Sequence, residues 1–576
     1  MTKSITQGAV ARFFSSPDTG RPRAAGWAAV GRWGFAAFLF VLLAAPTVPI
    51  IYQAFIDRPL YDTGQQWTLG NFTRLLADPS FLSALGNTAW FVLFSTVIST
   101  FIGLGAGLLI DRIALPARGL LKVCFLFPLF VSPLILAFAW SMLYGPGGYA
   151  TLLFRTLFGI GLPNLNSIGG MSLVAGVAQA PISYLYFAGA IGSIPSALEN
   201  SARSAGASPF RAMLDIVLPL LRPSVLFCVL LNVIMAVDLL AVPLIIGEPS
   251  RIQVLASYLY TNGVLSPKVD YGIVAATAVF LLVFIQIIIL LQSRVLGDIR
   301  RFNTVGGRAA RSARAVMTRG SWVLWAILVL YSLIASVIPC AFLILRSFTT
   351  FLSPLIPIEK VWTLDNFALI FSYESYVRSI VNTFLIATVG GFIAVVLTCA
   401  ATIVAYRTTP TMRLVIEQIS FLPRAVPGLI VGIGIFYAVI AVPGGSAISH
   451  TLLILIIAFT IRYFPTGFAA ISPAFLQIGA DLERAARVSG GSWFTALRDV
   501  TIPLLRPALI ACFLIYFVYF FKEYASASFL FGPGTEVIGT TMLQLNLMGN
   551  MGSVAALAVV QIALTVPVAI FVYARD

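Results

Sequence analysis

The chain has 576 residues, of which 59% are hydrophobic and only 10% are charged, and its formal net charge is +15. A soluble domain carries about 25% charged residues, so this composition excludes a soluble globular protein and indicates an integral membrane protein. The basic excess alone would also fit nucleic-acid binding, but the basic residues lie mainly in short segments between long apolar runs.

Apolar runs of about 20 residues, the length that crosses a bilayer as a helix, recur along the whole chain. The first six lie near residues 33–55, 84–110, 122–144, 169–192, 223–247 and 272–292. The second six lie near residues 321–345, 379–404, 415–440, 451–472, 508–530 and 553–573. The sequence therefore predicts an all-α integral membrane protein with about twelve transmembrane helices.

The positions of the basic residues predict how the chain is oriented. If the N-terminal tail, residues 1–32, is cytoplasmic, the predicted cytoplasmic segments contain 25 of the 36 Lys and Arg, and the outer loops contain eight. Such an excess is the positive-inside bias of membrane proteins. We therefore expect a multi-pass protein of the bacterial inner (plasma) membrane with both termini cytoplasmic. Its surroundings would be the lipid bilayer, with no nucleic acid as a partner.

The two sets of six predicted helices repeat one another. Residues 67–72, WTLGNF, return as residues 362–367, WTLDNF, and Asn87 returns as Asn382, each 295 residues later. Beyond the third helix of each set the offset is 284, so the first set has eleven additional residues. They fit best in the Gly- and Pro-rich outer stretch 145–170, because surface loops tolerate insertions. Six helices is an even number, so the two repeats are parallel.

The repeat divides the chain into two halves. The first spans residues 33–292, with its repeated core at 84–292, and the second spans residues 321–573, with its core at 379–573. Residues 293–320 join them and carry seven arginines against one acidic residue. We interpret this stretch as a solvated basic cytoplasmic linker near anionic lipid headgroups.

A polar segment follows the fourth predicted helix of each half. Residues 198–224 read LENSARSAGASPFRAMLDIVLPLLRPS, and residues 482–508 read LERAARVSGGSWFTALRDVTIPLLRPA. We call these the two polar segments. An ordinary loop explains one such segment, but two that keep the same glutamate, glycine and proline positions are better explained by a partner surface that the protein presents twice.

The first polar segment has the pattern of a helix, a turn and a second short helix. Ser196 and Glu199 match the Ser-x-x-Glu capping box that starts a helix. Gly206 permits a left-handed turn, and Ser208 before a proline is typical of the start of a second helix. Pro219 then marks the start of the fifth membrane helix. We predict that this unit lies on the cytoplasmic face and that the second polar segment repeats it.

The two polar segments resemble the EAA loop of ABC-importer permeases, in which Glu-Ala-Ala is followed after three residues by Gly and later by a leucine-proline pair. In that family the short helix of the loop docks in a groove of the cytoplasmic ATPase. The resemblance implies the type I ABC importer permease fold. It assigns ATPase coupling to Glu199, Asn200, Ala202, Gly206, Pro219, Glu483, Arg484, Ala486, Gly490 and Pro503. Asn200 and Arg484 depart from the pattern, because each stands where the glutamate is usual and follows a glutamate instead.

The same resemblance implies which partners the chain needs. No Gly-x-x-x-x-Gly-Lys-Ser/Thr phosphate-binding loop is present in the sequence, so we expect no ATP hydrolysis, no catalytic residue and no bound cofactor in this chain. The implied partners are two copies of a cytoplasmic ATP-binding subunit, which use the ATP, and an extracytoplasmic substrate-binding protein. We also predict no metal site, because five scattered cysteines and a single histidine, His450, form no ligand cluster.

Two further stretches resemble the iron(III) importer permeases, whose two halves are also fused. They are residues 238–249, DLLAVPLIIGEP, and residues 522–535, KEYASASFLFGPGT. Ferric iron is therefore the expected cargo. Related permeases for polyamines, thiamine, phosphonates or sugar phosphates share much of this pattern and stay open as alternatives.

Charged residues within the predicted membrane helices are candidates for the translocation path, because burying a charge in a bilayer is costly. Asp238, Lys522 and Glu523 lie in the fifth helices of the two halves, while Arg424 and Arg462 lie in the second half alone. The competing interpretation is that Lys522 pairs with a neighbouring carboxylate or that the arginines extend to the membrane surface.

A secondary transporter of the major facilitator type also has two parallel six-helix halves. Asp111-Arg112 faintly resembles the loop between the second and third helices of that class, but Tyr406-Arg407 at the matching place has no acidic neighbour. Nothing in that class requires a polar segment after each fourth helix. We therefore treat it as the remote alternative.

Overall fold

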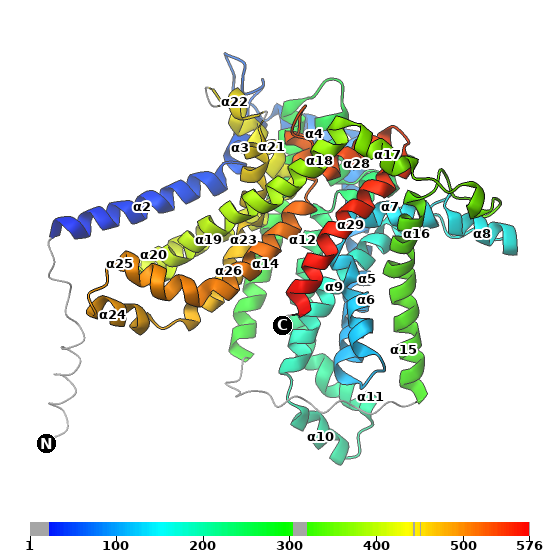
Figure 1. Ribbon diagram of the computed structural model, residues 1–576, viewed down its shortest axis with the longest axis horizontal. Helices are drawn as coiled ribbons and strands as arrows, with labels where there is room; N and C mark the ends of the chain where they lie inside the picture. The colour runs from blue at the N-terminus through cyan, green and yellow to red at the C-terminus, as the bar shows by residue number, and fades with distance from the viewer. Residues whose placement is uncertain (1–21, 303–318, 442–443, 450, 575–576) are drawn as a thin grey trace.

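The computed structural model describes residues 22–302, 319–441, 444–449 and 451–574, which are helical over most of their length (Figure 1). Nine of the described helices are long and apolar enough to cross a membrane, and twelve spans result if each of three bent helix pairs counts as one. Extended pairing among the described residues is confined to two isolated bridges, between Ile56 and Trp67 and between Thr349 and Trp362. The predicted all-α membrane fold is confirmed.

The first half contains the helices α2 (Pro22–Ala44), α3 (Thr47–Ala54), α4 (Gly70–Ala77), α5 (Pro79–Arg112), α6 (Arg118–Phe130), α7 (Pro133–Tyr144), α8 (Tyr149–Phe158), α9 (Ile168–Ser193), α10 (Ser196–Ser204), α11 (Pro209–Ala212), α12 (Leu218–Asp238), α13 (Leu255–Tyr260) and α14 (Tyr271–Phe302). The second half contains α15 (Arg319–Ser332), α16 (Ile338–Ser347), α17 (Asp365–Ser372), α18 (Glu374–Leu385), α19 (Gly391–Tyr406), α20 (Pro410–Phe421), α21 (Gly428–Ala441), α22 (Ser446–Ser449), α23 (Leu452–Gln477), α24 (Ala480–Val488), α25 (Trp493–Ala496), α26 (Ile502–Phe521), α27 (Ala527–Leu530), α28 (Ile538–Leu547) and α29 (Met551–Ala574). Of the predicted tail, residues 22–32 belong to α2 and residues 1–21 lie outside the described residues. Of the predicted linker, residues 293–302 continue α14 and residues 303–318 lie outside them.

Three predicted spans, 33–55, 122–144 and 415–440, are bent rather than straight. The chain turns by 51° between α2 and α3, by 104° between α6 and α7, and by 105° between the end of the α20 segment and α21. At the two sharper bends Ser132 and Val426 adopt extended backbone angles, and each precedes a proline. Proline disfavours the helical conformation in the residue before it, so the third span of each half cannot run straight.

The fifth predicted spans, 223–247 and 508–530, end earlier than we expected. The helix α12 stops at Asp238, and α26 stops at Phe521, directly before Lys522. Asp238 and Lys522 are equivalent positions of the repeat, 284 residues apart. Apolar residues continue on both sides of each break, which is why hydropathy alone does not detect it.

The helix boundaries follow the two sequence offsets. The helices α7 and α21 start 295 residues apart, whereas α9 and α23 start and end 284 residues apart. The eleven additional residues of the first half therefore lie between Tyr144 and Ile168, within the predicted stretch. This connection includes the separate helix α8.

The repeated WTL-x-NF motif forms the same contacts in both halves. The amide of Asn71 donates to the carbonyls of Ala54 and Ile56, and the amide of Asn366 donates to those of Ser347 and Thr349. Each asparagine thereby ties the helix that follows it to the end of the first span. These contacts also make Ala54 equivalent to Ser347, an offset of 293 within the first span.

The two halves are joined by an exchange of their first spans. In the first half, α2 packs against α20 and α3 packs against α21, both of the second half. In the second half, α15 packs against α6 and α16 packs against α7, both of the first. The indole of Trp140 donates to the carbonyl of Ala335 at 3.1 Å, and the indole of Trp325 donates to that of Pro116 at 3.2 Å, across this interface. The core is therefore shared between the halves.

Candidate functional site: two polar segments and a central charge cluster

Each polar segment folds as a short helix, a tight turn and a second helical segment. The turns are made by Gly206 and Gly490, which both have φ = +92°. This left-handed region is open to glycine and strained for residues with a Cβ. No atom lies within 4 Å of the place where a Cβ would stand at either position, apart from the local backbone. Glycine is therefore needed there for its backbone conformation and not for lack of space.

The second helical segment starts as predicted. Ser208 accepts a hydrogen bond from the backbone N–H of Arg211, and Ser492 accepts one from that of Thr495. These are N-cap contacts. The segment is not a separate helix, however, because it runs through a widened turn, Met213–Val217 or Leu497–Thr501, directly into the fifth span. Each widened turn precedes a proline, Pro219 or Pro503, which has no N–H for the regular helical bond.

The predicted capping box at the first helix is wrong. The helix α10 already includes Ser196, and its N-cap is Pro195, while α24 begins equivalently after Gly479. The carboxylate of Glu199 instead accepts from Nη1 of Arg112 at 2.7 Å. A helix that starts one residue earlier turns the glutamate towards the membrane helices and away from its own N-terminus.

The second half repeats this ion pair. Nε of Arg407 lies 2.7 Å from Oε1 of Glu483, and both side chains are largely buried. Arg112 and Arg407 end the second span of their halves and also donate to carbonyls near the end of the fourth span, those of Ile191 and Ile478. Each arginine thus fastens a polar segment to the membrane helices. Our sequence interpretation missed both, although their 295-residue offset was a usable signal.

Removing one of these arginines should loosen one polar segment. In Arg407→Gln, the backbone amides of α24 should exchange with deuterium about tenfold faster or more, because a charge-assisted hydrogen bond is worth about 1.5–3 kcal/mol. Hydrogen exchange by mass spectrometry measures this. Arg413→Gln is the matched control, since Arg413 forms an exposed pair with Glu417 one helix away. Equal exchange of α24 in the two variants would contradict the role of Arg407.

The other residues assigned to the polar segments face outward or lie at the edge. Asn200 and Arg484 are exposed, and Arg484 pairs only with the exposed Asp481, at 3.1 Å. Ala202 and Ala486 are half-buried. Large apolar side chains are also exposed on the segments: Leu198, Leu482, Val488, Trp493 and Phe494. The two polar segments lie at separate tips of the molecule, as the positions of α10 and α24 in Figure 1 show.

The three predicted path residues lie where the fifth spans break, and each contacts another element. Oδ1 of Asp238 accepts from the backbone N–H of Gly428 at 2.8 Å, at the first residue of α21. Nζ of Lys522 donates to the carbonyl of Leu129 at 3.0 Å, at the end of α6. An anion is favoured at a helix N-terminus and a cation at a C-terminus. The charge at each break therefore matches the helix end that it meets in the other half.

The repeat shows why these two charges differ. Gly428 aligns with Pro133, which has no N–H to offer to an aspartate. The residue equivalent to Asp238 in the second half is therefore a lysine that uses a free carbonyl instead. The contact between a broken fifth span and the bent third span of the opposite half is kept, while its polarity is reversed.

Arg462 of α23 connects the charges of the two halves. Its Nη1 lies 2.7 Å from Oε1 of Glu523, and its Nη2 lies 2.9 Å from Oδ2 of Asp238. The hydroxyl of Tyr463 also donates to Glu523. The Glu523 side chain is only 3% exposed, that of Arg462 15% and that of Asp238 30%. Asp238, Arg462 and Glu523 form what we call the central charge cluster.

The central charge cluster corrects the competing interpretation from the sequence. Arg462 does not extend to the membrane surface, and Lys522 forms no ion pair with a described carboxylate. Close approach depends on Gly428, because a Cβ there would stand 1.3 Å from Nη1 of Arg462. The sequence did not predict this arrangement, since Arg462 and Asp238 are 224 residues apart.

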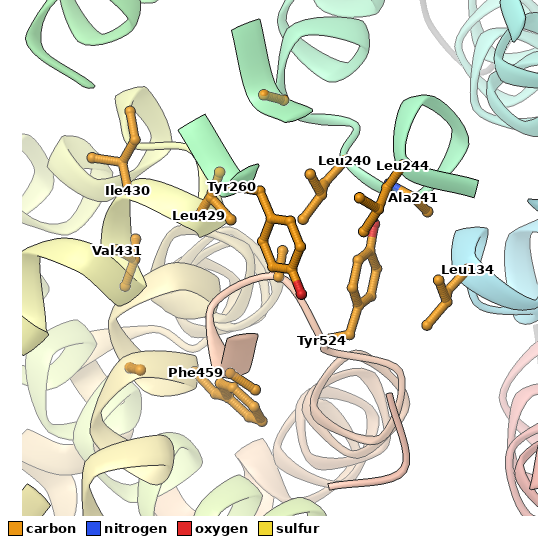
Figure 2. Close-up of a cluster of buried hydrophobic side chains, with 14 of the residues drawn as sticks. Leu134, Leu240, Ala241, Leu244, Tyr260, Leu429, Ile430, Val431, Phe459 and Tyr524 are labelled. Atoms are coloured by element: carbon orange, nitrogen blue, oxygen red, sulfur yellow. The ribbon is translucent and has the colours of Figure 1, made fainter. Parts of the chain in front are cut away.

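Apolar side chains close the space beside the central charge cluster. Figure 2 shows Leu240, Ala241, Leu244, Tyr260 and Tyr524 gathered where the chain leaves the broken fifth spans. The backbone N–H of Ala241 donates to the hydroxyl of Tyr524 at 2.8 Å, which joins the two breaks directly. All five side chains are at most 9% exposed. In this conformation no open channel passes between them.

Side chains able to bind a metal are scattered through the described residues. No group of three or more His, Cys, Asp or Glu within these ranges could hold a metal ion. All five cysteines are free thiols, and four of them are buried. His450 lies outside the described residues.

Comparison with known proteins shows two matches to one family along the chain. A family model described as "Binding-protein-dependent transport system inner membrane component" matches residues 99–301 and again residues 397–576. The ferric transport system permease protein FbpB of Actinobacillus pleuropneumoniae is 24% identical over 93% of this chain and 76% of its own length. A protein named as a 2-aminoethylphosphonate transport system permease, PhnV of Salmonella paratyphi A, is 29% identical over 26% of this chain and 56% of its own. A crystal structure of a bacterial alginate ABC transporter, in complex with its alginate-bound periplasmic protein, matches 42% of this chain and 85% of its own at 19% identity and a TM-score of 0.36.

Proposed function

Because the chain belongs to the family of binding-protein-dependent transport system inner membrane components, we propose that it forms the whole translocation path of an ABC importer and couples that path to a separate ATPase. The observation that carries the proposal is the pair of polar segments. Two segments with the same left-handed glycine turn and the same arginine–glutamate pair stand at separate tips of a single chain. Two equal contacts suit a partner that is present in two copies.

The partners follow from this arrangement. One ATP-binding subunit docks on each polar segment, where Asn200 or Arg484 and the exposed apolar side chains supply the contact. The tips that carry α10 and α24, and both chain termini, then face the cytoplasm. The opposite end of the molecule, which carries α8 and α28 (Figure 1), receives a substrate-binding protein. Docking energy reaches the membrane helices through Arg112 and Arg407.

A stoichiometry measurement tests the partner proposal. The chain should co-purify with an ATP-binding subunit that contains a phosphate-binding loop, and native mass spectrometry should show two copies per chain. A stable complex with a single copy, or none after co-expression with the candidate subunits, would contradict the proposed docking at both polar segments.

Two cargoes have specific support. Ferric iron is supported by the two signature stretches and by the FbpB relative, which aligns with nearly the whole chain. A phosphonate is supported by the PhnV relative over a shorter stretch. Uptake of ⁵⁵Fe(III) and of radiolabelled 2-aminoethylphosphonate by cells with and without the intact gene separates them, because only the true cargo should depend on the gene.

A further inference from the structure

A cavity of about 650 Å³ lies at the end of the molecule opposite the polar segments, between the two halves. Its walls come from α7, α8 and the turn after the fifth span in the first half, and from α16 and α28 in the second half. Its volume is that of a typical small-molecule site. Leu244 and Tyr260 contribute to its lining and also to the closed apolar cluster of Figure 2. The cavity thus stands directly outside the closed part of the path.

Two acceptor groups of the cavity wall lack partners. Oε2 of Glu248 and Oδ1 of Asn166 are both buried, and neither accepts a hydrogen bond from the described residues. Glu248 also forms no ion pair with a described cation. A buried carboxylate without a partner is costly. This cost indicates that a group carrying hydrogen-bond donors occupies the space beside Glu248.

A cationic group of the same wall is nearly as bare. Nη1 of Arg346 donates to the carbonyl of Thr349 at 2.6 Å, and this is its only hydrogen bond to the described residues. The guanidinium pairs with no described carboxylate, although it stands at the end of a membrane span. Arginine presents a planar fork of donors that suits carboxylate and phosphate-like oxygens.

The two opposite charges line one cavity without neutralising each other. No nitrogen of Arg346 lies within 4.0 Å of an oxygen of Glu248, since the ion pairs of the described residues do not include them. Both charges also break the repeat. The position equivalent to Glu248 is Gly532, and by the offset of 293 within the first span that of Arg346 is Gln53. A structural role in the shared fold would favour the same residue in both halves, so this pair points to a role particular to the cavity.

We propose that this cavity binds a small zwitterion, with its cationic amine at Glu248 and Asn166 and its anionic end at Arg346. The proposal rests on the importer function and narrows the cargo to a molecule with an amine at one end and a carboxylate or phosphonate at the other. A bare ferric ion fits poorly, because it requires several hard oxygen ligands and the arginine repels it. The cavity then holds the solute after its release from the binding protein, while the path below is still closed.

Direct binding to the purified chain with its ATP-binding subunits, in lipid nanodiscs without ATP, tests this site. Isothermal titration with 2-aminoethylphosphonate as the probe should show binding. Ethylphosphonate lacks the amine and ethylamine lacks the phosphonate, so each should bind at least about tenfold more weakly. Glu248→Gln and Arg346→Gln should each weaken the binding of 2-aminoethylphosphonate by a similar factor, since each removes one charge-assisted contact.

Glu359→Gln and Arg155→Gln are the matched controls, because both residues are exposed and lie outside the cavity wall. Thermal melting of each variant verifies that it is folded. Absence of binding to the wild type, or equal binding by the wild type, Glu248→Gln and Arg346→Gln, would overturn the zwitterion site. Assembly with the ATPase is scored in the same samples, so failure of the site and failure of the importer function are told apart.

Discussion

Replacing Arg462 by methionine is expected to destabilise the protein by about 3–5 kcal/mol, the cost of breaking a buried ion pair from one side. The change leaves Glu523 and Asp238 in an apolar setting without their shared cation, and Glu523 is almost fully buried. Because Arg462 also bonds to both halves, the loss should separate their broken fifth spans. Scanning fluorimetry in detergent should show a large fall in melting temperature, together with a low yield of folded protein.

Two further variants keep this prediction testable if Arg462→Met does not fold. The triple variant Arg462→Met, Asp238→Asn, Glu523→Gln removes all three charges and should recover most of the lost stability, because no unpaired charge remains. Arg424→Met is the control, since Arg424 is exposed and its contact with Gln292 is long, at 3.3 Å. A triple variant no more stable than Arg462→Met would show that packing, and not charge, explains the effect.

The double variant Gly206→Val, Gly490→Val is expected to abolish docking of the ATP-binding subunits while the membrane helices stay folded. A β-branched residue at φ = +92° costs roughly 1–2 kcal/mol or more at each turn, so the chain should adopt another turn that swings α10 and α24 away. Each single variant should lose one docked subunit. Size-exclusion chromatography with light scattering measures the mass of the complexes.

Gly479→Val provides the control for these glycine substitutions. Gly479 lies in the same region, but its φ of −60° is open to any residue, and nothing crowds a Cβ there. It should therefore assemble like the wild type. A full complex with the Gly206→Val, Gly490→Val chain would sink the docking role of the polar segments.

The repeated architecture could be predicted because the repeat supplies its own evidence. A shared offset identifies equivalent positions without any knowledge of contacts, and the boundaries of α9 and α23 follow it residue for residue. The left-handed turns at Gly206 and Gly490 were likewise predictable, since a glycine between two helix-forming stretches has a local explanation. Local signals of this kind act within a few residues.

The bends and the central charge cluster could not be predicted in the same way. Hydropathy measures how apolar a stretch is, not its direction, so a span that turns by 104° beside Pro133 looks continuous. The partners of Arg462 come from other helices, and only the folded chain brings them together. The signal that was present, and that we did not use, is the conserved offset between Arg112 and Arg407, each of which stands opposite a repeated glutamate.

The most direct test of the importer account is uptake into proteoliposomes that contain the chain alone or the chain with its ATP-binding subunits, supplied with the binding protein and its cargo. The account predicts ATP hydrolysis and cargo uptake only when the subunits are present, with both lost in the Gly206→Val, Gly490→Val chain. Uptake driven by an ion gradient with the chain alone, or ATP hydrolysis by the chain alone, would contradict it.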